Sequence, residues 1–190
     1  MIRSAISALA RAATSRRYCA ARIGAGSRVD FWKVRAKSDN RIEVGVNSIL
    51  ACRVVYERAG ARLNVGARTF VGLGLMSIAE RVEIGDDVMI SWGATIIDHH
   101  SHSTRARERT SDVEQWIKGR KDWTGVKIAA VWIENRAWLG FNVSVLPGVT
   151  IGEGAIIGAC SLVTRSVPAW TLAAGNPARV LRELTADERA

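Results

Sequence analysis

Aliphatic residues in the C-terminal half of the chain recur every six positions. The regular positions are Ile133, Leu139, Val145, Ile151, Ile157 and Val163. The same spacing returns upstream at Ile78, Ile84, Ile90 and Ile96, and weaker stretches begin at Val65 and Val44. A period of six matches neither an α-helix, which repeats every 3.6 residues, nor a strand, which alternates every two.

This period fits a chain that turns a corner every six residues and points one branched side chain inward from each side. Three sides make a coil of about 18 residues, and stacked coils bury a continuous aliphatic column between parallel strands. Glycine follows several of the aliphatic positions, which suits corners whose backbone other residues adopt at a cost. The sequence therefore predicts an all-β fold, a parallel β-helix over residues 37–170.

The first 29 residues contain six arginines and no acidic residue. Apolar residues at Ile2, Ile6 and Leu9 recur at helical spacing, so a short amphipathic helix is predicted within an N-terminal arm over residues 1–36. Three interpretations stay open: an arm packed on the main domain, a peripheral contact with acidic lipid, and a cleaved targeting peptide.

Composition narrows the choice of partner only in part. The chain has 190 residues, is 48% apolar and carries a formal net charge of +9, which favours anionic partners. Its three cysteines form no CxxC pair, so neither a disulfide framework nor a Cys-ligated zinc site is predicted, and a reducing compartment is favoured. No apolar run is long enough to span a membrane, and no nucleic-acid-binding motif is present. We therefore predict a cytoplasmic protein, at the inner face of the membrane if the N-terminal arm contacts lipid.

The run Trp138 to Leu184, WLGFNVSVLPGVTIGEGAIIGACSLVTRSVPAWTLAAGNPARVLREL, resembles the end of the hexapeptide-repeat acyltransferases. The chain is most similar to the acetyl-CoA-dependent sugar and polysaccharide O-acetyltransferases. This resemblance implies a left-handed winding of the β-helix, a homotrimer with active sites between neighbouring subunits, and acetyl-CoA as co-substrate without a required metal.

The six-residue period is interrupted between about residues 98 and 131, and a break of this length in a compact repeat is more often functional than incidental. Ser111 to Glu114 reads as a capping box that opens a short helix, which Gly119 ends. All three histidines lie at the entrance to this excursion, within Asp98-His99-His100-Ser101-His102.

A neutral imidazole can take the proton from an acceptor hydroxyl during acyl transfer. In the resembling family a catalytic histidine lies on a loop at this position, so we predict His102 as the general base and His100 as the second candidate. Asp98 is predicted to orient the ring or to hold the sugar. The alternatives are a polar loop with surface histidines and a metal site.

Aromatic and charged side chains surround the histidines in the sequence. Trp92, Trp116 and Trp123 are candidates for stacking on sugar faces, although packing of the excursion explains them equally well. The basic residues of the excursion are candidates for contact with an acidic glycan or a lipid-linked phosphate, but they are mixed with acidic ones, which is more typical of a solvated face. They are Arg105, Arg107, Arg109, Lys118, Arg120 and Lys121.

The final coils match the family's acetyl-CoA site residue by residue. The resemblance places Trp138, Gly140 and Phe141 near the thioester and Ala159 on the pantetheine. It places Thr164 and Arg165 beside the cofactor, and Arg179 and Arg182 near the nucleotide phosphates. Residues 171–190 are predicted to form a turn and a short C-terminal helix.

The prediction is an acetyl-CoA-dependent O-acetyltransferase that acts on a sugar hydroxyl, on a surface polysaccharide or its precursor. One alternative keeps the chemistry but acetylates the amine of an amino-sugar nucleotide. Another is a metal-dependent hydratase or a non-catalytic trimeric scaffold on the same fold.

Overall fold

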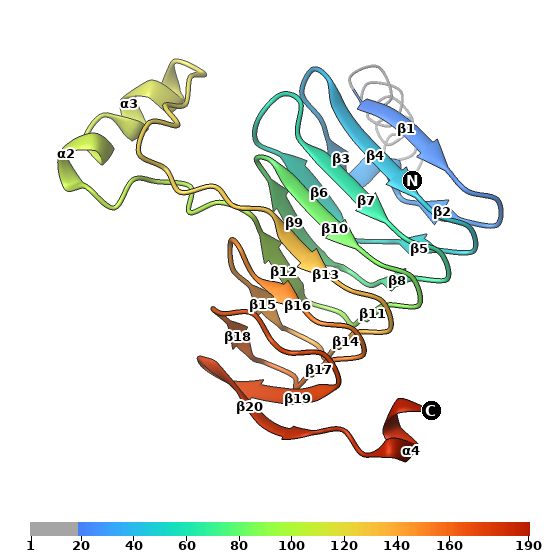
Figure 1. The fold of residues 1–190 in the computed structure, drawn as a ribbon. Helices are drawn as coiled ribbons and strands as arrows, with labels where there is room; N and C mark the ends of the chain where they lie inside the picture. The colour runs from blue at the N-terminus through green and yellow to red at the C-terminus, as the bar shows by residue number, and fades with distance from the viewer. Residues whose placement is uncertain (1–18) are drawn as a thin grey trace, which may run out of the picture.

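The computed structural model describes residues 19–190, and the predicted N-terminal helix lies outside this range. Three parallel sheets form the sides of a β-helix, whose coils stack along one axis from β1 to β19 (Figure 1). Six complete three-stranded coils are present and β19 begins a seventh. The coils wind in the left-handed sense, so the predicted fold class is confirmed. No helix within residues 19–190 is long and apolar enough to cross a membrane.

Each sheet takes one strand from every coil. Sheet A contains β1 (Cys19–Ile23), β4 (Asn40–Val44), β7 (Arg62–Val65), β10 (Arg81–Ile84), β13 (Val131–Ile133) and β16 (Thr150–Ile151). Sheet B contains β2 (Arg28–Val29), β5 (Ile49–Leu50), β8 (Phe70–Val71), β11 (Met89–Ile90), β14 (Trp138–Leu139), β17 (Ile156–Ile157), β19 (Thr171–Gly175) and β20 (Ala178–Glu183). Sheet C contains β3 (Val34–Arg35), β6 (Arg53–Tyr56), β9 (Gly74–Ile78), β12 (Ala94–Ile97), β15 (Ser144–Val145) and β18 (Leu162–Val163). The helices are η1 (Phe31–Lys33), α2 (Ala106–Arg109), α3 (Asp112–Ile117) and α4 (Ala186–Arg189).

Each step of six residues moves the chain from one sheet to the next. Ile133 lies in sheet A, Leu139 in sheet B and Val145 in sheet C, and Ile151 returns to sheet A in register with Ile133. All four side chains are buried. The column gains the free energy of removing stacked branched side chains from water, about 1.5–3 kcal/mol for each one fully buried.

The corners bring backbone against backbone, which explains the glycines there. A Cβ built on Gly66 would lie 2.4 Å from the carbonyl carbon of Gly85 in the next coil, and one built on Gly45 would lie 2.6 Å from the nitrogen of Ala67. Any side chain at these corners would push the coils apart.

Both predicted ends of the β-helix need correction. The boundary at residue 36 is too late, because residues 19–35 form β1, β2, η1 and β3 and make the first coil. At the other end, residues 171–183 form the antiparallel hairpin β19–β20 before the predicted helix α4. In the first coil Ile23 and Val29 keep the spacing of six, but the next core residue, Val34, follows after only five, so the period is irregular there.

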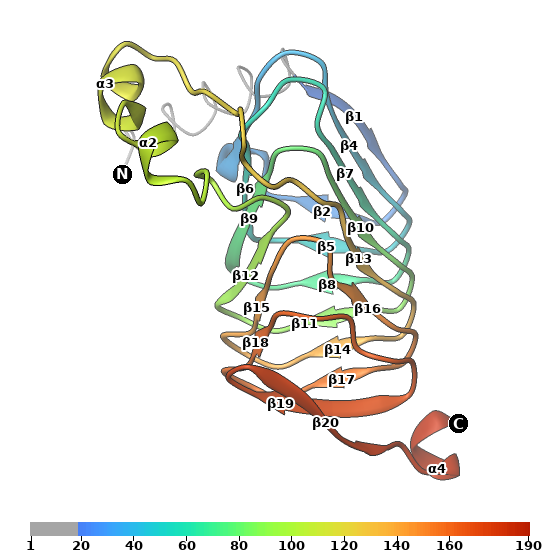
Figure 2. The same ribbon diagram turned by 60° about the vertical axis from the view of Figure 1, so that its left-hand side comes forward.

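The excursion leaves the prism between β12 in sheet C and β13 in sheet A, and α2 and α3 stand out from that corner (Figure 2). The predicted helix after Ser111 is confirmed as α3, but the Ser111 side chain makes no capping hydrogen bond. We call this corner, where every coil passes from sheet C to sheet A, the C–A corner.

Replacing Leu139, whose side chain is fully buried in sheet B, tests the aliphatic column. Leu139→Ala should lower the free energy of unfolding by about 2–5 kcal/mol, because it removes buried methyl groups and leaves a cavity. Chemical denaturation at fixed protein concentration measures this. Thr95→Ala, which points outward on β12, is the matched control and should change stability by less than about 1 kcal/mol. Equal losses in both variants would contradict an in-register core.

Candidate functional site

A cavity of about 190 Å³ lies at the root of the excursion. Its lining comes from the C–A corner and from the excursion, and consists of Glu57, His99, Ser101, His102, Trp116 and Lys121. Glu57 follows β6 directly, so the second coil forms one wall while the excursion forms the other. The Glu57 carboxylate is half-buried and makes no hydrogen bond or ion pair with residues 19–190.

His102 and Asp112 form a hydrogen-bonded pair in this wall. The Nδ1 atom of His102 lies 2.5 Å from a carboxylate oxygen of Asp112, the first residue of α3. The ring of His102 is 5.0 Å from that of Trp116, and about a third of its side chain is exposed. With Nδ1–H donating to the carboxylate, Nε2 carries a free lone pair and can accept a proton.

His99 is held in a different way. The backbone N–H of Ser101 donates to Nδ1 of His99 at 3.1 Å, so the neutral ring carries its proton on Nε2, which lies 3.1 Å from Oγ of Ser77. Burial lowers the pKa of His99, with nearby Asp98 opposing the shift. In this tautomer Nε2–H of His99 donates to Oγ of Ser77. Nε2 therefore has no free lone pair with which to take a proton from the Ser77 hydroxyl.

A tight turn connects the two histidines. Ser101 has φ of +61°, in the left-handed region, and the N–H of His102 donates to the carbonyl of His100 at 2.6 Å. Lys121 then fastens this turn to the excursion, since its Nζ donates to the Ser101 carbonyl and lies 4.8 Å and 4.9 Å from the ring centroids of Trp116 and Trp123. Burial lowers the pKa of Lys121.

Asp98 has a structural role instead of the predicted contact with sugar. Its side chain is fully buried, and its two carboxylate oxygens accept three backbone N–H bonds of 2.7 Å from Ala79, Glu80 and Arg81. Burial raises the pKa of this carboxyl, while the three N–H groups oppose the rise. Asp98 therefore ties the root of the excursion to the beginning of β10 and is not available to a ligand.

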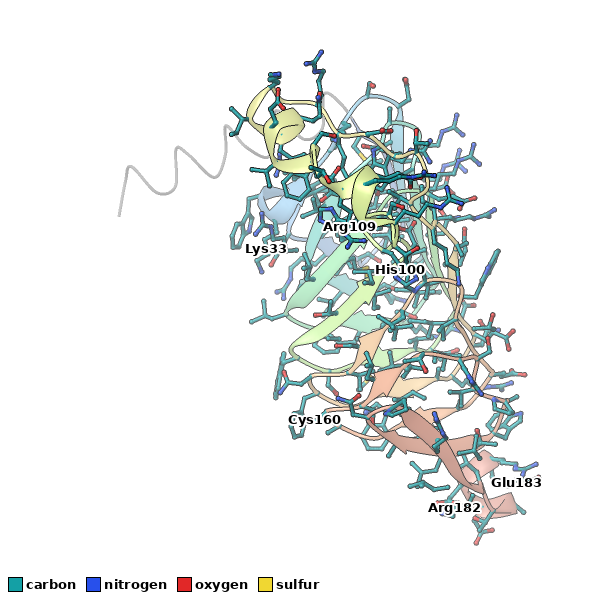
Figure 3. The ribbon with its side chains drawn as sticks, turned by 90° about the vertical axis from the view of Figure 1, so that its left-hand side faces the viewer. Lys33, His100, Arg109, Cys160, Arg182 and Glu183 are labelled. Carbon is teal, nitrogen blue, oxygen red and sulfur yellow. The ribbon has the colours of Figure 1, made fainter. Side chains whose placement is uncertain are left out.

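The two histidines that we predicted as bases lie in different surroundings. His102 lines the cavity, whereas the His100 side chain is exposed and does not line it. Figure 3 shows His100 near the junction between the excursion and the coils, and its backbone N–H donates to the carbonyl of Lys127 at 3.0 Å.

The three predicted sugar-stacking tryptophans are not all together. Trp116 lines the cavity, and Trp123 packs edge-on against His99 at 5.3 Å between centroids. Trp92 lies at the corner between sheets B and C, separated from the histidines by the length of β12, about 13 Å. Its side chain is 66% exposed. Trp92 is thus not part of the histidine cavity within one chain.

Four of the predicted cofactor residues gather on sheet B and on the corner that leads to sheet C, which we call the B–C corner. Trp138 points outward from β14, and Phe141 is exposed at the corner that follows. Gly140 and Ala159 stack in successive coils, where a Cβ on Gly140 would lie 2.7 Å from the nitrogen of Ala159. Gly140 is therefore required by the close approach of these coils.

The other predicted cofactor residues lie toward the C-terminal end. Thr164 and Arg165 follow β18 at the C–A corner, and Arg179 and Arg182 lie on β20. Arg182 makes two hydrogen bonds of 2.7 Å to Glu188 of α4, which lowers the pKa of Glu188 to about 2. Arg165 and Arg179 have no carboxylate partner within residues 19–190, so their guanidinium groups are less constrained than that of Arg182.

Sequence reasoning missed three residues of the site, of which Glu57 and Lys121 line the cavity and Asp112 pairs with His102. Asp112 was assigned to a helix cap, Lys121 to a solvated face, and Glu57 drew no attention. Asp112 followed the proposed cap residue Ser111, and only the fold shows that its carboxylate turns back ten residues to His102. Within the described part of the chain, no group of three or more His, Cys, Asp or Glu side chains is arranged to hold a metal ion.

The bacterial transferase hexapeptide family (six repeats) matches residues 130–165. The chain is 38% identical over 104 residues to WbbJ of Escherichia coli K12, named as a putative lipopolysaccharide biosynthesis O-acetyl transferase; the match covers 55% of this chain and 51% of WbbJ. A putative acetyltransferase of Schizosaccharomyces pombe is 34% identical over 116 residues, 61% of this chain and 47% of that protein.

Among solved structures, the hexapeptide-repeat acetyltransferase VCA0836 of Vibrio cholerae, complexed with acetyl coenzyme A, is similar with a TM-score of 0.61 and 27% identity. That likeness covers 93% of this chain and 78% of the other. The resemblance to the hexapeptide-repeat acyltransferases is thus confirmed. The matches to the curated relatives span between about a third and a half of those proteins' length.

Acid should destabilise the fold through His99. The unfolded chain binds a proton at His99 near pH 6.5, whereas the folded chain binds it only at lower pH, so stability is lost as pH falls below about 6.5. His99→Gln removes this contribution. The difference in unfolding free energy between wild type and His99→Gln, measured by denaturation from pH 7.5 to 5, should therefore narrow toward low pH.

The control is His100→Gln, because the His100 side chain is exposed in the same loop. If the difference in unfolding free energy between wild type and His100→Gln narrowed by the same amount toward low pH, the assignment to His99 would be contradicted.

Proposed function

We propose that this protein is an acetyl-CoA-dependent O-acetyltransferase that acts on a sugar hydroxyl, on a surface polysaccharide or its precursor. The observation that carries the proposal is the His102–Asp112 pair beside a cavity on a hexapeptide-repeat β-helix. The similarity over most of the chain to an acetyltransferase complexed with acetyl coenzyme A supports the choice of donor, and the similarity to WbbJ supports the choice of acceptor.

His102 acts as the general base. Its Nε2 accepts the proton of the acceptor hydroxyl while the acceptor oxygen forms its bond to the acetyl carbonyl carbon. Asp112 keeps the ring in the required tautomer and stabilises the imidazolium that results. The C–S bond then breaks, and His102 returns the proton to the sulfur, so that the products are an acetyl ester and a free thiol. Acetyl-CoA supplies an activated acetyl group, so the chemistry itself calls for no metal.

The cavity suits a carbohydrate acceptor. The exposed face of Trp116 can stack against the C–H groups of a sugar ring, and the half-buried carboxylate of Glu57 can accept hydrogen bonds from hydroxyls. Trp116 and His102 lie in the wall formed by the excursion and Glu57 lies in the other wall, so a sugar held between them would place a hydroxyl beside the base.

The exposed residues of the last coils fit the donor. Phe141 and Ala159 on the B–C corner present an apolar edge next to backbone groups, which suits the pantetheine chain. Arg165 and Arg179 supply guanidinium groups for phosphates. Arg182 is engaged by Glu188 and would first have to leave it.

A homotrimer completes this arrangement. Within one chain, the B–C corner with Phe141 and the C–A corner with His102 are separated by the width of sheet C. A second copy placed beside the first brings its own corner against the histidine cavity. The outward row of sheet B is apolar over six strands in register, as an interface between copies would require. This row consists of Ile49, Phe70, Met89, Trp138, Ile156 and Leu172.

We keep the cytoplasm as the proposed location, because acetyl-CoA is an intracellular metabolite and Cys19, Cys52 and Cys160 are all free thiols. A contact of the N-terminal arm with lipid would place the protein at the inner face of the membrane.

Substitution of His102 and of Asp112 tests the mechanism. His102→Ala should lower kcat for thiol release from acetyl-CoA by about 10²–10⁴-fold, since a positioned base contributes that much. Asp112→Asn should lower kcat less, and neither variant should greatly change KM for acetyl-CoA. Transfer to a panel of glycans, amino-sugar nucleotides and neutral sugars identifies the acceptor.

His100→Ala is the matched control and should keep near wild-type kcat. Full activity in His102→Ala would remove the catalytic assignment. Transfer only to amines would favour the N-acetyltransferase, and stoichiometric zinc with no thiol release would favour the hydratase.

Placing charged side chains in the apolar outward row of sheet B tests the proposed homotrimer. Phe70→Glu combined with Met89→Glu should convert the trimer to monomers in light scattering after gel filtration, because adjacent carboxylates would be buried between copies. Acetyltransferase activity should fall as the trimer is lost, because the proposed site is divided between chains. Two glutamates at Thr95 and Thr150, outward on sheets C and A, form the control; a trimer that persists in the Phe70/Met89 variant would refute this interface.

A further inference from the structure

Three arginines stack in register on the outer face of sheet A. Arg41 on β4 pairs with Arg62 on β7, and Arg62 pairs with Arg81 on β10. Neighbouring strands lie about 4.8 Å apart, so the three side chains project as a row parallel to the axis of the β-helix. We call Arg41, Arg62 and Arg81 the arginine ladder.

The ladder is electrostatically unfavourable in the protein alone. Like charges directly opposite one another on a sheet destabilise it. Arg81 pairs with Glu83 and lies over the ring of Trp132 at 5.1 Å, but Arg41 and Arg62 are exposed and their guanidinium groups have no ion pair with residues 19–190. An anion lying across the row would relieve this repulsion through planar, two-pronged hydrogen bonds.

A second row runs beside the ladder on the same strands. Glu43, Asn64 and Glu83 are in register one above the other, and Trp132 continues the row with its ring 42% exposed. Asn64 donates to Glu83 at 2.9 Å, which leaves the Glu43 carboxylate without a hydrogen bond from a described side chain. This row offers acceptors for hydroxyl groups and one aromatic face.

The ladder lies beside the root of the excursion. The N–H of Arg81 donates to Asp98 at 2.7 Å, and Asp98 is followed directly by His99, which lines the cavity. Arg41, Arg62 and Arg81 each stand at or near the beginning of a sheet A strand, beside the C–A corner from which the excursion leaves. A chain lying along the ladder therefore passes beside the corner that carries the histidine cavity.

We propose that the arginine ladder is a track for a linear acidic polysaccharide whose sugars carry carboxylates, and that this polysaccharide is the acceptor presented to His102. A pyranose ring is about as long as the gap between neighbouring strands, so a chain of uronate-type sugars lying along the row brings its carboxylates within reach of the arginines. Their hydroxyls face the row of Glu43, Asn64 and Glu83. The part of this inference that concerns acetylation rests on the proposed function; the binding track does not.

The second row favours a glycan over a membrane surface. Anionic lipid headgroups would bring negative charge against Glu43 and Glu83 as well as against the arginines, and they would offer few hydroxyls to these carboxylates. A glycan carries anions and hydroxyls alternately along its length and matches both rows at once.

Direct binding tests the track independently of catalysis. The full-length protein is titrated into fluorescently labelled oligogalacturonate of about ten sugars, with a neutral dextran oligosaccharide and phosphatidylserine vesicles as comparison probes. Wild type should bind oligogalacturonate, less tightly as salt rises, and should bind dextran weakly. Arg41→Gln combined with Arg62→Gln should weaken binding by about tenfold or more.

The matched control is Arg35→Gln combined with Arg53→Gln, which removes the same charge from exposed arginines on sheet C that are not in register with each other. It should stay within about twofold of wild type, since isolated surface charges contribute little. His102→Ala should bind the glycan as wild type does.

Three results would overturn the track: no binding of oligogalacturonate by wild type, an equal loss in the control, or a ladder variant that loses vesicle binding alone. Ladder-dependent binding without acetyl transfer to any acceptor would leave the track in place and refute the proposed function. Acetylation of neutral sugars with no ladder-dependent binding would support the proposed function and refute the track.

Discussion

The whole molecule depends on burying one branched side chain per side of each coil directly above its equivalent in the next coil. Ile133 over Ile151 and Leu139 over Ile157 can pack in this way only if the corners between them are narrow, which is why Gly45, Gly66 and Gly140 allow no Cβ. Dispersion and the hydrophobic effect stabilise the column, and the parallel hydrogen bonds between coils fix its register.

The same register controls the outer surface. Because inward side chains are aligned, outward ones are aligned too, and any residue type repeated at one outward position becomes a row. Sheet B thereby acquires an apolar row through Phe70, Met89 and Trp138, and sheet A acquires the arginine ladder. In an irregular fold these residues would scatter. Here a repeat that fills a core also builds extended surfaces, which suit extended or repeated partners.

The excursion lacks this regularity and carries His102, the proposed general base, and polar contacts hold it in place. Asp98 anchors its root with three backbone N–H groups, Lys121 ties its far end to the histidine turn, and Asp112 reaches His102 from α3. No buried side-chain nitrogen or oxygen among residues 19–190 lacks a hydrogen-bond partner, which shows how fully these groups satisfy one another. Such a network holds an imidazole in one orientation, as general-base chemistry requires.

The contrast between the regular coils and the irregular excursion also decides what could be predicted from the sequence. The period of six predicted the coils and their inward residues, because each position has the same environment in every coil. It failed at the first coil, where the step from Val29 to Val34 is five residues, and at the β19–β20 hairpin, where the repeat ends. The clustering of all histidines located the cavity, but no period relates His102 to Asp112 or Lys121 to Ser101, so these contacts emerge only from the folded excursion.

The separation of Phe141 from His102 by the width of one sheet links these observations. A β-helix is too stiff to fold its own corners together, because any bend would open the aliphatic column that stabilises it. Under the proposed function, His102 at the C–A corner receives the acceptor and Phe141 at the B–C corner lies beside the thioester, and a single chain cannot bring these two residues together. In the proposed trimer a second rigid prism set alongside does so, and the apolar outward row of sheet B would then serve the chemistry as well as the assembly.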